Sequence, residues 1–254
     1  MSAVDLLPGR IAEIRLDNPG KLNALTLPML EALEAHCAAI EADQGTRAVV
    51  LTAAPARAFC AGADIAAWGD LAPADFARAW VRAGHRAFDR LARLAVPTVA
   101  ALQAHALGGG LELAAACDAR TMAPGATLGL PETGVGVTPG WSGTQRLARL
   151  LPEPVLKEMA LFGRRLDAPR AHGLGFAAAI APAARAAAFA LAEAAAAASP
   201  RATEIAKWAI HAAAGEDAAA AIEALAGGMV AATADRAEGV AAFRDRRPPA
   251  FPGR

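Results

Sequence analysis

The chain has 254 residues, of which 55% are hydrophobic, so it can bury a full core as one large domain or as a domain with an appendage. Its 25 lysine and arginine side chains balance 25 aspartate and glutamate side chains, which argues against a nucleic-acid-binding surface. Apart from alanine-rich helical tracts, no apolar run is long enough to span a membrane, and the N-terminal residues lack a secretory signal pattern, so we expect a cytoplasmic protein without a membrane partner.

The N-terminal part of the chain alternates between strand and helix patterns. A loosely alternating strand at residues 10–16 leads through a turn and a loop to an amphipathic helix, which Thr26 is placed to cap and which ends near Ala42. A second buried strand covers residues 48–52, and residues 57–65 form a loop with glycine at its bend. A long helix at residues 73–94 follows, and the proline after it is expected to end it.

The stretch at residues 97–118 is the centre of the pattern. Residues 98–102 predict a buried strand, the three consecutive glycines Gly108–Gly110 follow, and strong helix formers come next. Such a passage points backbone N–H groups at one place and lets a ligand approach the backbone, with Glu112 one turn inside the helix. It could stabilise an oxygen that becomes negative during a reaction, although a tight turn without a ligand gives the same pattern. The glycines match neither the P-loop nor the dinucleotide fingerprint.

Strand and helix patterns continue to about residue 181, and only helices follow. The predicted elements are a strand at 119–123, a glycine- and proline-rich loop at 133–140, helices at 141–151 and 153–162, a short helix ending at 172–173, a strand at 176–181 and an alanine-rich helix at 183–198. Helices at about 200–213, 217–233 and 235–245 precede a tail without a regular pattern. This order predicts an α/β core followed by a helical C-terminal piece.

Cysteine and histidine give no sign of a disulfide or a metal site. The three cysteines, Cys37, Cys60 and Cys117, are odd in number and widely spaced, so we expect them to be reduced, buried small residues. The five histidines do not have metal-ligand spacing, and we expect no bound metal.

Five segments, taken in order, carry a resemblance to a known family. They are NPGKLNAL at 18–25, AFCAGADI at 58–65, ALGGGLEL at 106–113, PE at 131–132 with TPGWSGTQRL at 138–147, and DRAEG at 235–239 with Phe243. Together they resemble the crotonase superfamily, also called the enoyl-CoA hydratase/isomerase family. The resemblance implies an α/β fold that is a crotonase-like spiral of ββα units with a C-terminal helical trimerisation region. We therefore expect a core with an acyl-CoA site at residues 1–198 and an oligomerisation region at residues 199–254, in a homotrimer or a dimer of trimers.

The resemblance also implies a chemistry. Members of this family bind acyl-CoA thioesters and stabilise an enolate on the thioester oxygen with two backbone N–H groups, which by motif belong to Ala63 and Gly109. The implied catalytic residues are Glu112 and Glu132, which would hold one water and exchange proton roles as it adds to C3 while C2 is protonated. This implies an enoyl-CoA hydratase that converts trans-2-enoyl-CoA reversibly to 3-hydroxyacyl-CoA. Coenzyme A would be part of the substrate, with no further cofactor.

Other functions on this fold stay open. An isomerase would keep a single catalytic carboxylate, matching Glu132, and other thioester reactions such as decarboxylation or hydrolysis are alternatives. A non-catalytic scaffold or an RNA-binding relative would not need both glutamates, and the balanced charge disfavours RNA. A serine protease of related fold is disfavoured because neither oxyanion motif carries a nucleophilic serine and Ser142 is poorly placed.

Several positions match the family's substrate contacts. The implied CoA- and substrate-binding residues are Lys21, Leu22, Ala24, Arg57, Ala61, Asp64, Ile65 and Gly108, and the candidates for the acyl pocket are Trp68 and Trp141. Lys21 and Arg57 can equally be solvated surface charges, Asp64 a helix cap and Trp141 a core residue. Ala66 stands where many relatives carry a basic residue, so a contact on the adenine side is expected to be missing.

The C-terminal helices are apolar on more than one face, which predicts that they drive trimer formation. The apolar residues concerned are Ile205, Trp208, Ile210, Ile222, Leu225, Met229 and Val230. Phe243 and Phe251 are candidates for contact with a CoA site, in the same subunit or in a neighbour.

Overall fold

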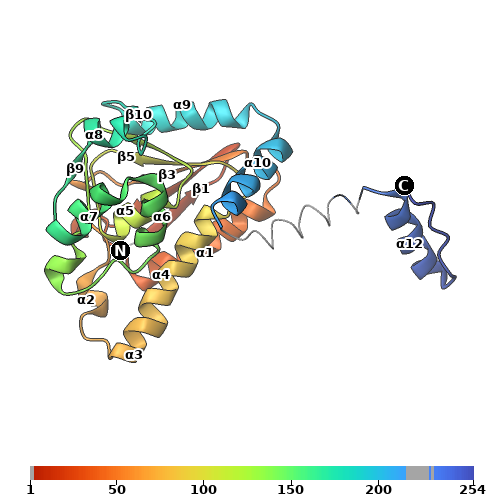
Figure 1. Cartoon of the computed structure of the whole chain (residues 1–254), viewed down its shortest axis with the longest axis horizontal. Helices are drawn as coiled ribbons and strands as arrows, with labels where there is room; N and C mark the ends of the chain where they lie inside the picture. Colours follow the sequence, from red (N-terminus) through yellow and green to blue (C-terminus); the bar gives the residue numbers. More distant parts are fainter. Residues whose placement is uncertain (1–2, 216–228, 230–231) are drawn as a thin grey trace. The chain divides into compact units, whose positions relative to one another are not determined.

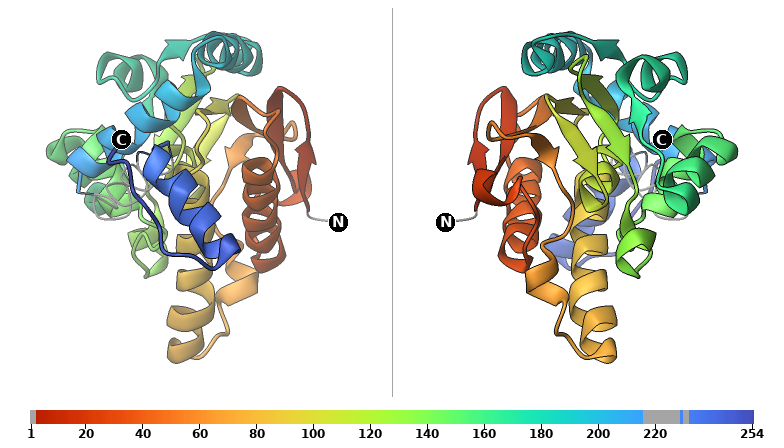
Figure 2. Two further views of the ribbon diagram at one scale, coloured as in Figure 1. Left: turned by 90° about the vertical axis from the view of Figure 1, so that its right-hand side faces the viewer. Right: turned by 90° about the vertical axis from the view of Figure 1, so that its left-hand side faces the viewer.

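In the computed structural model, which describes residues 3–215, 229 and 232–254, the chain divides into two compact units, Met1–Pro200 and Arg201–Arg254. The first unit combines two β-sheets with helices packed around them (Figures 1 and 2). The α/β class predicted from the sequence is therefore confirmed.

Within the described residues, the larger sheet has six strands in the order β1-β2-β3-β5-β7-β10, and the smaller sheet has four in the order β4-β6-β8-β9. The strands of the larger sheet are β1 (Ala3–Leu7), β2 (Ile11–Asp17), β3 (Ala48–Ala53), β5 (Thr98–Leu102), β7 (Ala119–Met122) and β10 (Ala179–Ile180). Those of the smaller sheet are β4 (Ala58–Cys60), β6 (His105–Leu107), β8 (Thr127–Gly129) and β9 (Leu166–Asp167).

The chain winds between the two sheets in a repeating order. In each of the pairs β3-β4, β5-β6 and β7-β8, the first strand joins the larger sheet, the second joins the smaller sheet and a helical segment follows. Successive strands within each sheet are parallel, except that β1 and β9 are antiparallel to their neighbours. The winding is the expected spiral of ββα units. The helices of this unit are α1 (Leu27–Ala42), α2 (Ile65–Trp68), α3 (Pro73–Asp75), α4 (Arg82–Ala92), α5 (Gly109–Ala115), α6 (Gly143–Leu150), α7 (Glu153–Phe162), α8 (Ala168–Gly173) and α9 (Ala184–Ala196), with short helical turns at Pro19–Lys21 and Glu132–Val135.

The two faces of the larger sheet have different partners. In β3, Val49 and Leu51 belong to the main core, whereas Ala48 and Val50 belong to a second cluster on the opposite face. That second cluster is completed by a stripe of small residues on α9, Ala188, Ala192 and Ala196. The alanine-rich helix predicted at 183–198 is therefore a packed helix, whose small side chains let it lie close to the sheet (Figure 1).

Some elements differ from the sequence prediction. The sequence does not predict β1, an edge strand in which only Val4 is buried, nor β4 and β6, whose three residues are too few for an alternating pattern. The helix predicted at 73–94 is interrupted by a π-helical turn, Phe76–Val81, between α3 and α4. The strand predicted at 176–181 is reduced to the two residues of β10.

Local expectations have mixed outcomes. Thr26 precedes α1 as predicted, but its hydroxyl makes no capping bond. Cys37, Cys60 and Cys117 are buried, as predicted, and are not joined in disulfides. Among the described residues, no helix has the length and apolar character that crossing a membrane requires, and no three His, Cys, Asp or Glu side chains gather as a metal site would need.

The described residues of the second unit include most of α10 (Pro200–Ala213) and all of α12 (Ala234–Asp245). The tail is held along α12, because Arg247 and the Ala250 N–H both bond to Glu238 and the Gly253 N–H bonds to Asp235. The helix predicted at 217–233 lies outside the described residues except at 229, 232 and 233, and so do the predicted interface residues Ile222, Leu225 and Val230.

A buried carboxylate ties α9 to the larger sheet. Glu13 in β2 accepts hydrogen bonds from the Thr52 hydroxyl at 2.7 Å and from Arg185 of α9 at 3.0 and 2.5 Å. Burial alone would raise the pKa of Glu13, but these hydrogen bonds and the charge of Arg185 outweigh burial and lower the pKa below its usual 4.5.

We expect Glu13→Gln to be less stable than the wild type near neutral pH, by about 1–2 kcal/mol, because charge-assisted hydrogen bonds become neutral ones. A lowered folded-state pKa gives stability that is present above the unfolded pKa and is lost as the pH falls through the folded pKa. Urea unfolding should therefore show a smaller difference in the free energy of unfolding between the two proteins near pH 3 than near pH 7. An equal difference in unfolding free energy at the two pH values would contradict this role for Glu13.

Candidate active site

Two strand-to-helix passages meet because β4 and β6 are parallel neighbours in the smaller sheet. One passage runs from β4 through Gly62, with φ +100°, and the other from β6 through Gly108, with φ +52°. A Cβ atom on Gly62 would lie 3.0 Å from the Leu107 carbonyl oxygen and 3.2 Å from the Gly109 nitrogen. Both positive φ values and this close approach require glycine, so the two backbones are in contact.

The contact brings together two backbone N–H groups, those of Ala63 and Gly109. A Cβ atom on Gly109 would lie 3.6 Å from the Ala63 nitrogen. An isolated bridge next to Ala63 uses the Gly62 carbonyl and the Asp64 N–H, both bonded to Leu25 at 2.8 Å, and leaves the Ala63 N–H outside it. Gly109 is the first residue of α5, so its N–H has no partner within that helix. Two donors at one point are the arrangement that stabilises an oxyanion.

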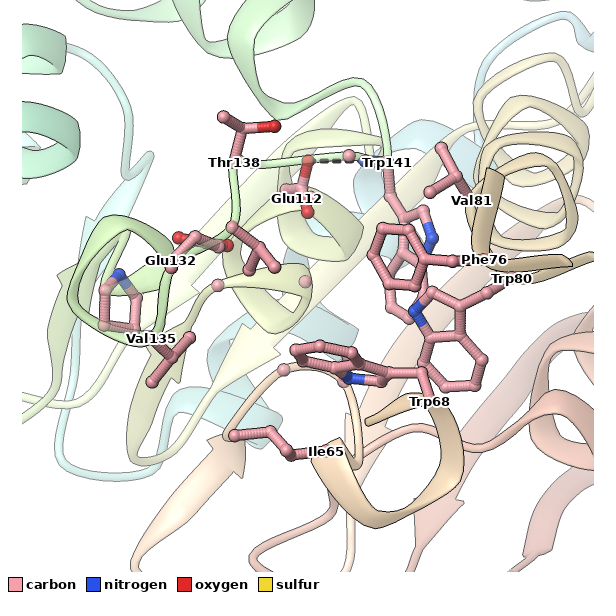
Figure 3. A pocket seen from close by; sticks show the side chains of 18 of the residues that line it. Ile65, Trp68, Phe76, Trp80, Val81, Glu112, Glu132, Val135, Thr138 and Trp141 are labelled. Carbon is pink, nitrogen blue, oxygen red and sulfur yellow. Dashed lines mark hydrogen bonds between the residues drawn. The ribbon is translucent and has the colours of Figure 1, made fainter. Parts of the chain in front are cut away.

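Both residues line a cavity of about 480 Å³ (Figure 3). Glu112, Glu132 and Gly108 line the same cavity, as do Ala61, Ile65, Trp68 and Trp141 from the predicted site. Further lining residues that the sequence did not single out include Phe76, Trp80, Val81, Val135 and Thr138. Phe76 and Trp80 were missed because an aromatic residue on the apolar face of a helix has the same pattern whether it faces a core or a cavity.

Glu112 is held by a turn of the backbone. The residue is 2% exposed, and its Oε1 accepts the Trp141 N–H at 2.8 Å and the Gly143 N–H at 2.7 Å. A Cβ atom on Gly143 would lie 2.5 Å from Oε1, so a side chain there would displace the carboxylate. Burial raises the pKa of Glu112, although the two N–H donors and the charge of Arg146 oppose the rise.

Within the part of the chain that the structure describes, the carboxyl group of Glu132 lacks hydrogen bonds of the kind that hold Glu112. Both carboxyl oxygens are buried, and neither has a hydrogen-bond partner among the described residues. Gly108 makes room for the group, because a Cβ atom there would lie 2.9 Å from the Glu132 Oε1. Burial raises the pKa of Glu132 to about 7, its own backbone N–H opposes the rise, and the charge of Glu112 adds to it. The group can therefore both hold and release a proton near neutral pH.

Ser142 lies between the two N–H donors and has φ +75°. Its hydroxyl is hydrogen-bonded to His85 of α4, with Oγ 3.0 Å from Nδ1. Neither residue is among those lining the cavity, so the pair holds the turn that carries the donors rather than facing a substrate.

The remaining predicted contact residues do not line the cavity. Lys21 and Asp64 form an ion pair at 2.6 Å, and Asp64 also accepts the Ala66 N–H at 3.2 Å as the cap of α2. Leu22, Ala24 and Arg57 are not among the residues lining the cavity, and Arg57 is exposed. The structure thus brings Ala61, Ile65 and Gly108 into the cavity and leaves these others outside it.

We expect Glu132→Gln to be more stable than the wild type near pH 8 and almost equal to it near pH 4. The raised pKa means that the folded protein holds this proton more tightly than the unfolded chain, so ionisation weakens the folded state as the pH rises from 4.5 towards about 7. Urea unfolding at the two pH values measures the difference. If the wild type were instead the more stable protein near pH 8, Glu132 could not be buried without a hydrogen-bond partner.

Comparison with known proteins gives matches along the whole chain. The family model described as enoyl-CoA hydratase/isomerase matches residues 7–254. The chain is 36% identical to the probable enoyl-CoA hydratase 2, mitochondrial, of Arabidopsis thaliana over 96% of this chain and 82% of that protein. It is 39% identical to the putative enoyl-CoA hydratase/isomerase YngF of Bacillus subtilis over 96% of this chain and 95% of that protein.

Solved structures agree with these sequence matches. The enoyl-CoA hydratase of Bacillus anthracis superimposes with a TM-score of 0.80 at 35% identity, covering 100% of this chain and 99% of the other. DspI of Pseudomonas aeruginosa superimposes with a TM-score of 0.82 at 32% identity, covering 98% and 96%.

Proposed function

The chain belongs to the enoyl-CoA hydratase/isomerase family and has its crotonase fold, and on this premise we propose that it is an enoyl-CoA hydratase. It would add water reversibly to trans-2-enoyl-CoA and give 3-hydroxyacyl-CoA. The observation that carries the proposal is that two buried carboxyl groups, Glu112 and Glu132, line one cavity together with the backbone donors Ala63 and Gly109.

The thioester oxygen would lie between the N–H groups of Ala63 and Gly109. As the oxygen of water bonds to C3, the electrons of the C2–C3 double bond move towards the thioester and its oxygen becomes negative. Two fixed backbone donors need no rearrangement to stabilise that charge, and one such donor is typically worth about 10²–10³ in kcat. This makes the contact between the two glycine passages the electrostatic centre of the reaction.

The two glutamates differ in ways that suit two roles. Burial raises the pKa of Glu112, and the two N–H donors oppose that rise by stabilising the ionised form, which can take a proton from the water as a general base. The pKa of Glu132, about 7, keeps a protonated fraction near neutral pH, and this group can give its proton to C2. One carboxyl group gains a proton while the other loses one, so the charge of the pair is unchanged over the reaction.

Coenzyme A enters as part of the substrate, and we propose no other cofactor. The exposed Ile65 marks the side of the cavity nearest the solvent, and Asp64, which pairs with Lys21, precedes it in the chain. Contacts of Lys21, Leu22, Ala24, Arg57 and Asp64 with CoA stay predictions.

We expect Glu112→Gln and Glu132→Gln each to lower kcat by about 10²–10⁴, the usual range for general acid–base groups. The double variant should lose little more than either single one, because the two groups act together in one addition of water. A spectrophotometric assay of enoyl-CoA hydration measures all three, with thermal unfolding as the control for folding. If Glu112→Gln kept its turnover while Glu132→Gln lost it, isomerisation with one carboxylate would be the better function.

We also propose that the second unit mediates assembly into a trimer or a dimer of trimers. Several of its apolar side chains are exposed in the single chain: Ile205, Ile210, Met229, Phe243 and Phe251. Burial of these side chains against other copies would remove apolar surface from water. Contact of Phe243 or Phe251 with CoA stays a prediction.

Light scattering should give a mass that is a multiple of three chains. Ile210→Lys should shift the protein towards smaller species, because a charge is costly in an apolar interface. The matched control is Leu161→Lys, an exposed leucine of α7 in the first unit, which should leave the mass unchanged. A stable, active monomer of the wild type would contradict the proposal.

A further inference from the structure

The cavity runs from an exposed rim to a buried aromatic end. Ile65 and Val135 on one side are 52% and 54% exposed, whereas Trp80 and Trp141 on the other are 2% and 3% exposed (Figure 3). The CoA part of a thioester is large and charged and stays in contact with water. The acyl group therefore has to extend from the rim towards Trp80 and Trp141.

The indole of Trp141 is fixed at this end. A Cβ atom on Gly84 would lie 2.2 Å from the indole, and one on Gly109 would lie 2.7 Å from it, so the ring fills a notch between two glycines. It also packs on Trp80, with ring centroids 5.4 Å apart, and edge-on against Phe88 at 5.3 Å. With protein on each of these sides, the ring cannot swing away to admit a longer chain.

Aromatic rings dominate the wall beyond the two glutamates. Trp68 and Phe76 pack together with centroids 5.3 Å apart and line the cavity with Trp80 and Trp141. The charged side chains that line the cavity are Glu112 and Glu132, and the aromatic end is apolar apart from indole N–H groups such as that of Trp68. The cavity has a volume of about 480 Å³, and at its aromatic end the packed indole of Trp141 limits how far an acyl chain can extend.

We propose that the acyl group is a planar aryl group conjugated with the enoyl double bond, so that the substrate is a 3-arylacrylyl-CoA. Packing of one aromatic ring on another contributes more binding free energy than burial of the same apolar area alone. A flat aryl group also has few rotatable bonds, so little conformational entropy is lost when it is held between fixed aromatic rings. Trp141 sets the depth of the cavity and is the specificity-determining residue. The inference rests on the proposed function. In that reaction the hydroxyl group of water bonds to C3, the other proton of the water goes to Glu112, and Glu132 gives its proton to C2.

Binding of saturated thioesters tests the acyl class without any turnover. Isothermal titration of the wild type with 3-phenylpropanoyl-CoA, hexanoyl-CoA, decanoyl-CoA and free CoA compares the acyl groups directly. We expect 3-phenylpropanoyl-CoA to bind at least about tenfold more tightly than either straight-chain thioester. Turnover with cinnamoyl-CoA, trans-2-hexenoyl-CoA and trans-2-decenoyl-CoA should give the same order in kcat/KM.

Variants at the closed end connect the preference to Trp141. Trp141→Ala removes the ring but keeps the N–H that holds Glu112, and it should erase the aryl preference and strengthen decanoyl-CoA binding. Gly84→Ala should push the indole into the cavity and weaken aryl binding, and it tests the same point if Trp141→Ala does not fold. The matched control is Phe162→Ala, an exposed aromatic residue of α7 that does not line the cavity, which should keep the wild-type preference.

The outcomes separate this inference from the proposed function. Tighter binding of decanoyl-CoA than of 3-phenylpropanoyl-CoA by the wild type would overturn the inference, even if every enoyl-CoA were hydrated. An aryl preference in binding without hydration of any substrate would support the acyl class and contradict the hydratase. An unchanged preference in folded Trp141→Ala would show that this ring does not select the acyl group.

Discussion

The contact between the Gly62 and Gly108 passages is the constraint on which the rest of the site depends. The smaller sheet sets β4 beside β6, and the two bends that follow meet with no space for a side chain. This contact places the N–H groups of Ala63 and Gly109 at one point. Gly108 also leaves room for the carboxyl group of Glu132. A methyl group at Gly62 would press on the backbone at Leu107 and Gly109, and one at Gly108 would displace the carboxyl group of Glu132.

The turn from Trp141 to Gly143 links two functions in one piece of backbone. Its N–H groups hold Glu112, while the Trp141 side chain forms the end of the cavity. The left-handed Ser142 between them, bonded to His85, directs both N–H groups to the same carboxylate oxygen. The position of Glu112, the proposed base, and the aromatic end of the cavity are thus set by the same three residues.

Much of this could be predicted from local patterns, because glycine bends, helix starts and single carboxylates are local features. Gly109 and Glu112 share one motif, and the α/β order follows from the alternation of buried strands and helices. The cavity itself could not be predicted, because its position depends on pairing between the three-residue strands β4 and β6. Trp80 was missed for a related reason: the sequence cannot tell which side of a helix faces an empty space.

The physical basis of the chemistry differs from that of substrate selection. The proposed oxyanion donors are backbone N–H groups, and Glu112 is held by backbone N–H groups, so both persist when a neighbouring side chain changes. The aromatic end consists of side chains alone, held by packing against Gly84 and Phe88. Substitutions there can alter which acyl group fits without moving the charges that stabilise the transition state. Under the proposed function, one fold can therefore keep its oxyanion site and its glutamates while the acyl group that it accepts changes.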